Sequence, residues 1–433
     1  MIEFKQLEKL LKNVFPSEDD RPWKVLKFGG KSLSNGEGLQ RVLQLIQEKA
    51  TKGQRLTVVL SARERTTDNL EHILDLAAKR ADYNTELTEL FNYQKKGYQI
   101  DFTDEINRLG KILEGVSLIG DYSLKTKDEV LAFGEVFSGK LVSKLLTERG
   151  MKARFVDSRD LLVTDSTFGD AHIHENVSKA KVISRFLEFS NGDVPVVTGF
   201  ISANEKGETT TLGRNGSNYT AALLANYLDA EEMLNYTHVN GIYTANPELV
   251  HKAKIIGNLS YGEANELANF GAKVLHAKTI IPLIEKNIPL RILNTFNKDS
   301  KGTLISSKTE KEGITSLSVL EDVALINLEG RGLLGKVGVD ARIFGALEKR
   351  KINVGIISQG SSERGIGLIV DLNRADEAKQ ALRDEFQTDY TTKDVNTISV
   401  QKDVAVISAI GQDLSSFHKP FNALVKNKII PLL

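Results

Sequence analysis

The sequence predicts an α/β protein in which a mostly parallel sheet, covered by helices on both faces, precedes smaller βαββαβ units. Three observations lead to this prediction. Strand and helix patterns alternate over residues 24–315, the strand candidate at residues 56–60 is almost continuously apolar, and residues 323–433 contain an internal repeat. Alternating strands and helices are typical of parallel sheets, and a continuous apolar strand is typical of a sheet covered on both faces.

The composition narrows the class of protein. The chain has 433 residues, and its 57 Lys and Arg balance its 57 Asp and Glu. A neutral chain is a poor bulk electrostatic partner for nucleic acid or for an anionic membrane. Because there are no cysteines, disulfides, thiolate metal sites and cysteine nucleophiles are excluded. With no apolar run of about 18 residues and no signal-peptide pattern, we expect a cytoplasmic protein.

The first 23 residues predict a helical arm followed by a polar turn. A strand at residues 25–28 then ends in Gly29-Gly30, and apolar residues at helical spacing predict a helix over residues 39–46. Residues 80–128 read as a charged helical insertion over the sheet edge. Further strands are expected at residues 56–60, 154–156, 194–197, 232–235 and 290–293.

Polar, glycine-containing segments at residues 297–302 and 308–313 predict a loop and a linker that close the first domain, residues 24–315. The repeat then begins, because residues 323–330 (VALINLEG) have an echo in residues 404–411 (VAVISAIG). Each copy continues with an amphipathic helix, at residues 339–349 or 417–426, and a short strand, at residues 352–354 or 429–431.

The first copy of the repeat is complete and the second is not. A strand at residues 365–371, a helix at 375–386 and a strand at 397–400 finish a βαββαβ unit over residues 316–400. The second unit, residues 401–433, stops after βαβ. Such a unit leaves a sheet edge uncovered, so we expect a longer natural chain, or another segment or subunit, to cover it.

Two glycine-containing loops are candidates for binding anions. Lys27-Phe-Gly-Gly30 follows a strand, so backbone N–H groups and a lysine can approach a phosphate; the alternative is an ordinary strand end. Residues 209–218 (TTTLGRNGSN) lead into a helix expected at residues 219–228. There Arg214 can hold a carboxylate with two hydrogen bonds, while Ser217 or Asn218 can simply be the helix N-cap.

Three further patterns in the sequence are weaker indications of a site. Glu135 precedes a helix expected at residues 136–146, so it is either a helix-start carboxylate or a ligand for an ammonium group. Residues 330–335 match G-x-G-x-x-G but lack the parallel βα units of a dinucleotide site. His172-x-His174 is the one histidine pair at metal-ligand spacing, and surface exposure is the better explanation.

Several segments together resemble the successive signatures of aspartate kinases, in the family's order. They are residues 25–33 (VLKFGGKSL), 61–70 (SARERTTDNL), 131–138 (LAFGEVFS), 210–225 (TTLGRNGSNYTAALLA) and 270–279 (FGAKVLHAKT). Residues 338–363 resemble the first ACT regulatory unit of these enzymes. The resemblance is strongest to the kinase half of bifunctional aspartokinase–homoserine dehydrogenases, which implies a possible fused dehydrogenase domain beyond Leu433. The resemblance also implies an amino-acid-kinase fold followed by ferredoxin-like ACT units.

The resemblance implies transfer of the γ-phosphoryl group of MgATP to the β-carboxylate of L-aspartate. Lys27 and Lys273 would be catalytic, and the nucleotide would lie against Gly29, Gly30, Ser32, Thr237, His238 and Tyr243. Arg214 would bind the α-carboxylate of aspartate and Glu135 its α-ammonium. The remaining pocket residues would be Ser61, Thr67, Phe200, Ser217 and Asn218.

The ACT resemblance implies threonine as the effector and pairing of ACT units in a homodimer or larger homo-oligomer. The candidate effector contacts are Asp340, Asn353, Val354 and Gln359. The chain departs from the family pattern at Lys31, Asn218, His238, Asn240, Asn246 and Glu248. These departures remove acids and reverse a charge on the nucleotide side. They therefore motivate a second hypothesis, an inactive amino-acid sensor that retains the kinase fold.

Overall fold

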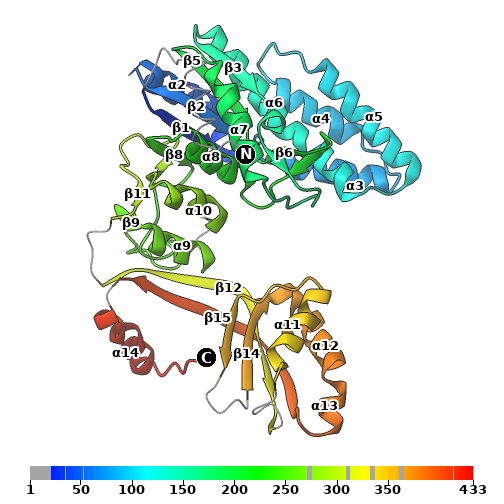
Figure 1. Cartoon of the computed structure of the whole chain (residues 1–433), viewed down its shortest axis with the longest axis vertical. Helices are drawn as coiled ribbons and strands as arrows, with labels where there is room; N and C mark the ends of the chain where they lie inside the picture. The colour runs from blue at the N-terminus through cyan, green and yellow to red at the C-terminus, as the bar shows by residue number, and fades with distance from the viewer. Residues whose placement is uncertain are drawn as a thin grey trace, which may run out of the picture. The chain divides into compact units, whose positions relative to one another are not determined.

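The structure, a computed structural model, describes residues 21–34, 36–51, 53–270, 276–308, 313–331, 337–359, 365–412 and 414–432. The chain forms two compact units (Figure 1). The first unit contains the residues up to Tyr243, Ile255–Asn265 and Val274–Glu310, and the second contains Thr244–Lys254, Glu266–Lys273 and Lys311–Leu433. The expected helical arm lies almost entirely outside the described residues.

The first unit is built on an eight-stranded sheet with the order β3-β5-β2-β1-β8-β10-β11-β9. Its neighbouring strands are parallel except for the antiparallel pair β10 and β11. The mostly parallel sheet and its expected strands are therefore confirmed. The strands are β1 (Trp23–Phe28), β2 (Arg55–Leu60), β3 (Lys152–Val156), β5 (Asp193–Thr198), β8 (Glu232–Thr237), β9 (Asn258–Ser260), β10 (Leu290–Asn294) and β11 (Thr303–Ser306).

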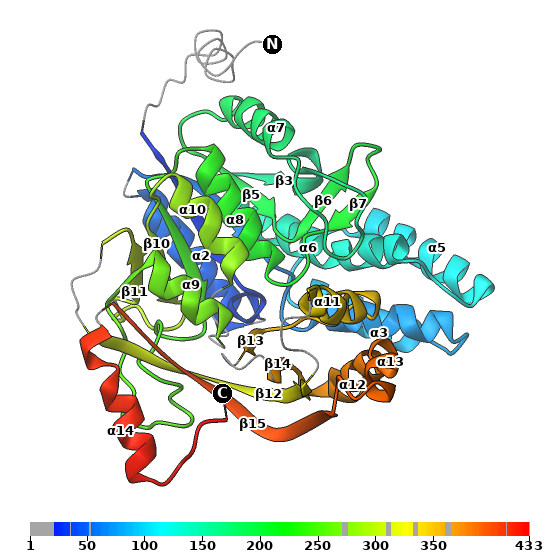
Figure 2. The ribbon, with the colours of Figure 1, turned by 60° about the horizontal axis from the view of Figure 1, so that its bottom comes forward.

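Helices cover both faces of this sheet. The helices are α2 (Glu37–Thr51), α3 (Thr66–Ala78), α4 (Asn84–Lys95), α5 (Thr103–Ile119), α6 (Leu124–Glu148), α7 (Glu175–Leu187), α8 (Gly216–Tyr227), α9 (Tyr261–Asn269) and α10 (Ala277–Glu285). A small side sheet contains β4 (Val163–Thr164), β6 (Ile201–Asn204) and β7 (Thr209–Thr211). Helices α4 and α5 form the helical insertion expected at residues 80–128 and pack with α3. Helix α8 lies beside α10 (Figure 2).

The strand β1 shows why the sheet needs cover on both faces. Leu26 and Phe28 pack with residues of α2, α3 and α6 in one hydrophobic cluster. The ring of Phe28 stacks on Tyr236 of β8 with 4.7 Å between the ring centroids. Side chains alternate along a strand, so Val25 and Lys27 face the other side, where α8 packs on β1.

No helix of the described chain is both long enough and apolar enough to cross a bilayer.

The second unit has a four-stranded sheet in the order β13-β14-β12-β15. Its strands are β12 (Ile314–Glu329), β13 (Ile356–Gln359), β14 (Gly365–Asp371) and β15 (Thr397–Gly411), and its helices are α11 (Val339–Lys349), α12 (Ala375–Glu385), α13 (Gln387–Thr391) and α14 (His418–Lys426). The helix expected at residues 339–349 is confirmed. The strand expected at 352–354 is wrong, because the strand begins at Ile356, and residues 429–431 form no strand.

Two long strands, β12 and β15, replace three shorter ones that the sequence predicted at residues 323–330, 397–400 and 404–411. The later part of β12, from Val323, pairs with β14 and with residues 397–404 of β15. The earlier part, residues 314–320, pairs with residues 406–411. The echo segment of the repeat therefore pairs with residues that come before the first copy.

Candidate active site

The carboxyl ends of neighbouring parallel strands form one edge of the first unit's sheet. Strands β5, β2, β1 and β8 stand side by side and end at Thr198, Leu60, Phe28 and Thr237. The chain runs outward from β1 to β2 on one side and returns to β8 on the other. Open α/β sheets bind ligands at such a reversal, outside the carboxyl ends of the strands.

Lys27 lies at this edge with its side chain buried. It is 8% exposed, and no hydrogen bond or ion pair joins its ammonium group to any described residue. Burial without a compensating carboxylate lowers the pKa of Lys27 to about 8. In the strand register its neighbours are Val59 on β2 and Asn235 on β8. The lysine is therefore a buried cation whose charged form an anionic ligand would stabilise.

The turn after β1 is held close to the segment after β2. The Glu64 N–H donates to the Gly30 carbonyl at 3.0 Å, and the Gly29 N–H donates to the Tyr236 carbonyl at 3.3 Å. A Cβ atom at Gly30 would lie 2.5 Å from the Ala62 carbonyl oxygen, so a side chain there would force the two segments apart. The Ser32 hydroxyl accepts a hydrogen bond from Thr295 at 2.7 Å.

Glu135 does not begin a helix, so its interpretation as a helix-start carboxylate is wrong. It lies in the middle of α6, which starts at Leu124 after Ser123, whose hydroxyl accepts the Thr126 N–H at 3.2 Å. Glu135 is 3% exposed, and its Oε1 accepts the Ala62 N–H at 3.1 Å. Its Oε2 is buried and has no hydrogen-bond partner among the described residues. Burial raises the pKa of Glu135 to about 8.

The loop before α8 also differs from the expected helix start. The helix begins at Gly216, and its N-cap position is Asn215, in the left-handed region with φ of 59° and no capping side chain. Ser217 and Asn218 are therefore buried residues of the first turn and not the N-cap. Asn218 Oδ1 is buried without a partner among the described residues. Arg214 is exposed in the loop just before this turn.

The turn after β5 packs directly against the start of α8. A Cβ atom at Gly199 would lie 2.6 Å from the Ser217 Cβ atom. Phe200 has a positive φ of 68°, and its N–H donates to the Thr220 hydroxyl at 3.1 Å. The structure thus brings Phe200 and Ser217, two predicted pocket residues, to the same place.

The other predicted pocket residues lie on the segments that follow β2 and β8. The Ser61 N–H donates to the Phe28 carbonyl at 3.2 Å, and Thr67 stands in the first turn of α3, half-buried. Thr237 is the last residue of β8, and its hydroxyl lies 3.4 Å from His238 Nδ1. Burial, with a smaller effect of Lys31, lowers the pKa of His238. Tyr243 forms a β-bridge with Ile255.

Asn240, one of the positions where the chain departs from the family pattern, has a local structural role. Its Oδ1 accepts from the side-chain amides of Asn294, at 2.8 Å, and Asn297, at 3.0 Å. Its carbonyl accepts from the Ser300 hydroxyl at 2.8 Å. The amide therefore ties the loop after β8 to the loop after β10.

Some predicted residues lie elsewhere. Lys273 is outside the described residues, as is most of the 330–335 glycine pattern. The effector candidates belong to the second unit: Asp340 lies in the first turn of α11, Asn353 and Val354 precede β13, and Gln359 ends β13. His172 and His174 are paired with Asp165 and Glu205. No described group of three or more His, Asp or Glu side chains is arranged to hold a metal ion.

Sequence analysis missed two polar residues at this edge. Asn235 is 3% exposed beside Lys27, and its Oδ1 has no partner among the described residues. An amide inside an otherwise apolar strand was the available signal. Arg63 is fully buried, and no sequence signal marked it because arginine side chains are usually exposed.

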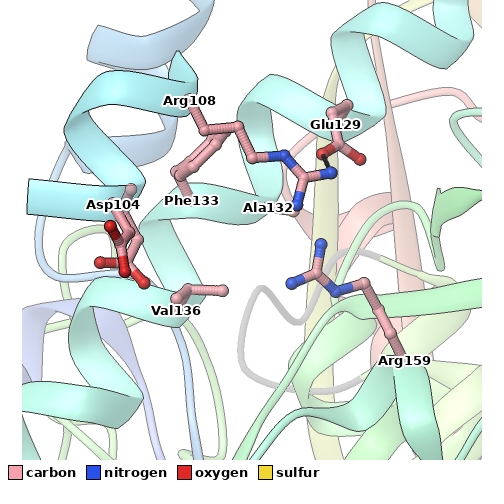
Figure 3. Close-up of a pocket in the computed structure, with 8 residues that line it drawn as sticks. Asp104, Arg108, Glu129, Ala132, Phe133, Val136 and Arg159 are labelled. Carbon is pink, nitrogen blue, oxygen red and sulfur yellow. Dashed lines mark hydrogen bonds and ion pairs between the residues drawn. The ribbon is translucent and has the colours of Figure 1, made fainter. Parts of the chain in front are cut away.

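A pocket of about 140 Å³ lies between α5, α6 and the turn at Ser158–Asp160 (Figure 3). The guanidinium groups of Arg108 and Arg159 point toward it, and Glu129 pairs with Arg108. It contains none of the predicted site residues. Of the signature segment at residues 131–138, Ala132, Phe133 and Val136 line it and Glu135 does not.

Comparison with known proteins gives consistent matches. Residues 22–294 match the amino acid kinase family, and residues 326–386 match an ACT domain. The chain is 32% identical to the lysine-sensitive aspartokinase 3 of Escherichia coli K12, with 90% of this chain and 87% of that protein covered. It is also 32% identical to the bifunctional aspartokinase/homoserine dehydrogenase of Haemophilus influenzae, with 90% of this chain and 50% of that protein covered.

A solved structure agrees with these matches. The crystal structure of E. coli aspartokinase III in complex with aspartate and ADP is similar with a TM-score of 0.77 and 29% identity. It covers 93% of this chain, and 91% of the crystallised chain is covered. The chain spans about half the length of the bifunctional relatives that it matches.

Proposed function

Because the chain belongs to the amino acid kinase family, among its aspartokinases, we propose that it transfers the γ-phosphoryl group of ATP to the β-carboxylate of L-aspartate. The observation that carries the proposal is the set of buried polar atoms without partners at one sheet edge. Glu135 Oε2 and Asn218 Oδ1 are buried, and neither has a hydrogen-bond partner among the described residues. Lys27 is 8% exposed as a residue, and its ammonium group has no carboxylate partner among those residues. A buried polar atom without a hydrogen-bond partner destabilises the folded protein, and a ligand that bonds to it removes this cost.

The reaction needs positioning more than proton transfer. A side-chain carboxylate with a reference pKa of about 3.9 is already ionised at neutral pH, so the nucleophile requires no general base. In-line transfer then depends on holding the carboxylate and the γ-phosphorus together and on neutralising the charge on the transferred group. Lys27, on β1, would supply that charge, and the Gly29-Gly30 turn would let the phosphates approach the backbone closely, because glycine has no side chain.

The amino-acid side of the site would bind aspartate through opposite charges. Glu135 would receive the α-ammonium on its free Oε2, and Arg214 would hold the α-carboxylate with two hydrogen bonds. Ser61, Thr67, Phe200 and Ser217 would form the walls. Asn218 would contribute its amide in the first turn of α8.

Mg²⁺ would arrive as the MgATP complex. Its preferred ligands are oxygen atoms, and it usually keeps several waters and substrate phosphates. We therefore propose that the metal is held mainly by the nucleotide phosphates and water. On the nucleotide side, Ser32, Thr237, His238, Tyr243 and Lys273 remain the proposed contacts.

The second unit supports a regulatory proposal. We infer that threonine binds the ACT region through Asp340, Asn353, Val354 and Gln359, and that ACT units pair in a homo-oligomer. The proposal depends on the sequence of residues 357–363, which resembles threonine-responsive members. A lysine-sensitive relative exists, so inhibition by each amino acid should be measured side by side.

The test is turnover of ATP and aspartate with the acyl phosphate trapped as its hydroxamate. We expect product with L-aspartate, and a loss of at least about 100-fold in kcat for Lys27→Ala. A folded chain that binds threonine but neither ADP nor aspartate in calorimetry would instead be the sensor. That result would overturn the kinase proposal.

A further inference from the structure

The segment after β2, residues 61–67, contacts both sides of the proposed site through successive residues. The Ala62 N–H donates to Glu135 Oε1 at 3.1 Å, and the Glu64 N–H donates to the Gly30 carbonyl at 3.0 Å. Between them stands Arg63, to which the proposed function gives no role. Its exposed fraction is 0%, and it heads the fully buried side chains by volume.

The Arg63 guanidinium joins two segments that are far apart in sequence. Its Nε donates to the Leu33 carbonyl at 3.2 Å. Its Nη1 donates to the Gln94 carbonyl at 3.2 Å and lies 3.4 Å from Gln94 Oε1. Leu33 ends the 3₁₀ turn Gly30–Leu33 after β1, and Gln94 lies in the last turn of α4. The guanidinium carbon lies 4.9 Å from the centroid of the Tyr93 ring.

Gln94 extends these contacts to a third segment. Gln94 is 1% exposed, and its Nε2 donates to the Thr66 hydroxyl at 2.8 Å. The Thr66 N–H in turn donates to the Arg63 carbonyl at 2.9 Å. Thr66 begins α3, directly before the pocket residue Thr67. One buried network therefore joins the turn after β1, the start of α3 and the end of α4.

We propose that Arg63 is a positioning residue that fixes the Gly30–Leu33 turn relative to Glu135 and Thr67. This inference rests on the proposed kinase function. The turn belongs to the nucleotide side, whereas Glu135 and Thr67 belong to the aspartate side. Arg63 thereby sets the separation between the two substrates, and Gln94 makes α4 of the helical insertion part of that support.

The chemistry of the side chain suits this role. Guanidinium presents several N–H donors in one rigid plane, so it can reach the Leu33 and Gln94 oxygens together, whereas a lysine ammonium on a flexible stem is a point charge. A displacement of about 1 Å between reacting groups can cost about 100-fold in rate.

The experiment compares Arg63→Met and Arg63→Lys with a matched control, Arg159→Met. Arg159 lies in the same unit, pairs with Asp157 at 2.6 Å and donates to Thr209, but it takes no part in the proposed site. We expect Arg63→Met to lower kcat/KM for ATP by about 10- to 100-fold, with a partial recovery in Arg63→Lys. We expect Arg159→Met to lower the melting temperature and leave the KM for ATP near that of the wild type.

A second measurement does not depend on turnover. Hydrogen exchange of a peptide covering residues 29–34 should become faster in Arg63→Met and remain unchanged in Arg159→Met. Should Arg63→Met fail to fold, Gln94→Leu serves instead, because it keeps the backbone carbonyl bond to Arg63 and removes the side-chain bonds. It should change both readouts in the same direction by a smaller factor.

The inference is overturned if Arg63→Met, or its Gln94→Leu substitute, lowers the melting temperature but leaves exchange over residues 29–34 and KM for ATP unchanged. A wild-type chain without turnover would remove the proposed function alone. The exchange comparison would still decide whether Arg63 positions the turn.

Discussion

At the scale of single residues, the charge state of Lys27 should set the alkaline limit of activity. Its pKa is lowered to about 8 by burial, and only the protonated form can neutralise a transferring phosphoryl group. Activity should therefore fall as the pH rises through about 8. Asn235→Asp places a carboxylate on the neighbouring strand position, which favours the charged lysine.

The prediction is that Asn235→Asp moves this falling limb to higher pH by about one unit, while Asn235→Leu, of similar size, does not raise it. The measurement is kcat/KM for ATP against pH from 6 to 10. An identical alkaline limit in the wild type and Asn235→Asp would show that another group controls it.

A second residue-scale prediction concerns Glu135. Burial raises its pKa to about 8, so at pH 7 the free protein holds it mostly as the neutral acid. A bound α-ammonium favours the carboxylate and lowers that pKa. Aspartate binding at pH 7 should therefore release about one proton. Calorimetry in two buffers that differ in ionisation enthalpy measures this release.

Glu135→Gln is the matched variant, because its amide oxygen can still accept the Ala62 N–H. It should abolish the proton release and weaken aspartate binding by roughly tenfold or more. Equal proton release in the wild type and in Glu135→Gln would assign the titration to a different group.

At the scale of elements, close contacts between backbones hold the site segments together. Gly199, at the end of β5, leaves no room for a Cβ atom beside Ser217 of α8. Gly199→Ala should push the first turn of α8 away from the sheet and destabilise the first unit by about 1–3 kcal/mol, as overpacking does. The KM for aspartate should rise, because Ser217, a proposed pocket residue, lies at this contact.

Gly110→Ala is the control for that prediction. Gly110 lies inside α5 with open space around its Cα atom, so alanine should stabilise the helix by about 0.5–1 kcal/mol. Thermal unfolding and aspartate kinetics of the two variants check both signs. A rise in stability for Gly199→Ala would contradict the close packing of β5 against α8.

Element existence could be read from the sequence, but element ends and interior roles could not. The apolar runs of β1, β2 and β5 predicted strands because burial on both faces demands them. Glu135 was misplaced because α6 has 25 residues and little amphipathic pattern, so Ser123 was a weak start signal. Strand β12 was cut short because pairing with β15, which is distant in sequence, extends it to Ile314.

The site shows the same division between motif and packing. Lys27 lies near the end of β1, Gly30 and Phe200 follow strand ends, and Ser217 lies in the first turn of α8. Local motifs were therefore enough to place them at one edge. Arg63 joins Leu33 and Gln94, segments that only the folded chain brings together. Its burial follows from tertiary packing, which the composition of residues 61–70 does not encode locally.

At the scale of the whole molecule, two compact units carry two proposed ligands. The first unit would bind ADP and aspartate, and the second would bind threonine. A ligand stabilises the unit that binds it by mass action. Threonine can inhibit the kinase only if it binds two global states with different affinities.

Thermodynamic linkage makes that requirement testable without knowing either state. If saturating threonine weakens the binding of ADP and aspartate by some factor, saturating ADP and aspartate must weaken threonine binding by the same factor. We expect a factor of about 5–150, the usual range for allosteric coupling. Calorimetric titration of threonine into the protein, with and without ADP and aspartate, measures it directly. Unchanged threonine affinity, in a chain that threonine inhibits, would contradict coupling through substrate affinity. A threonine affinity that keeps falling in proportion to the aspartate concentration would place threonine in the aspartate pocket, as a competitor, and not at Asp340 and Gln359.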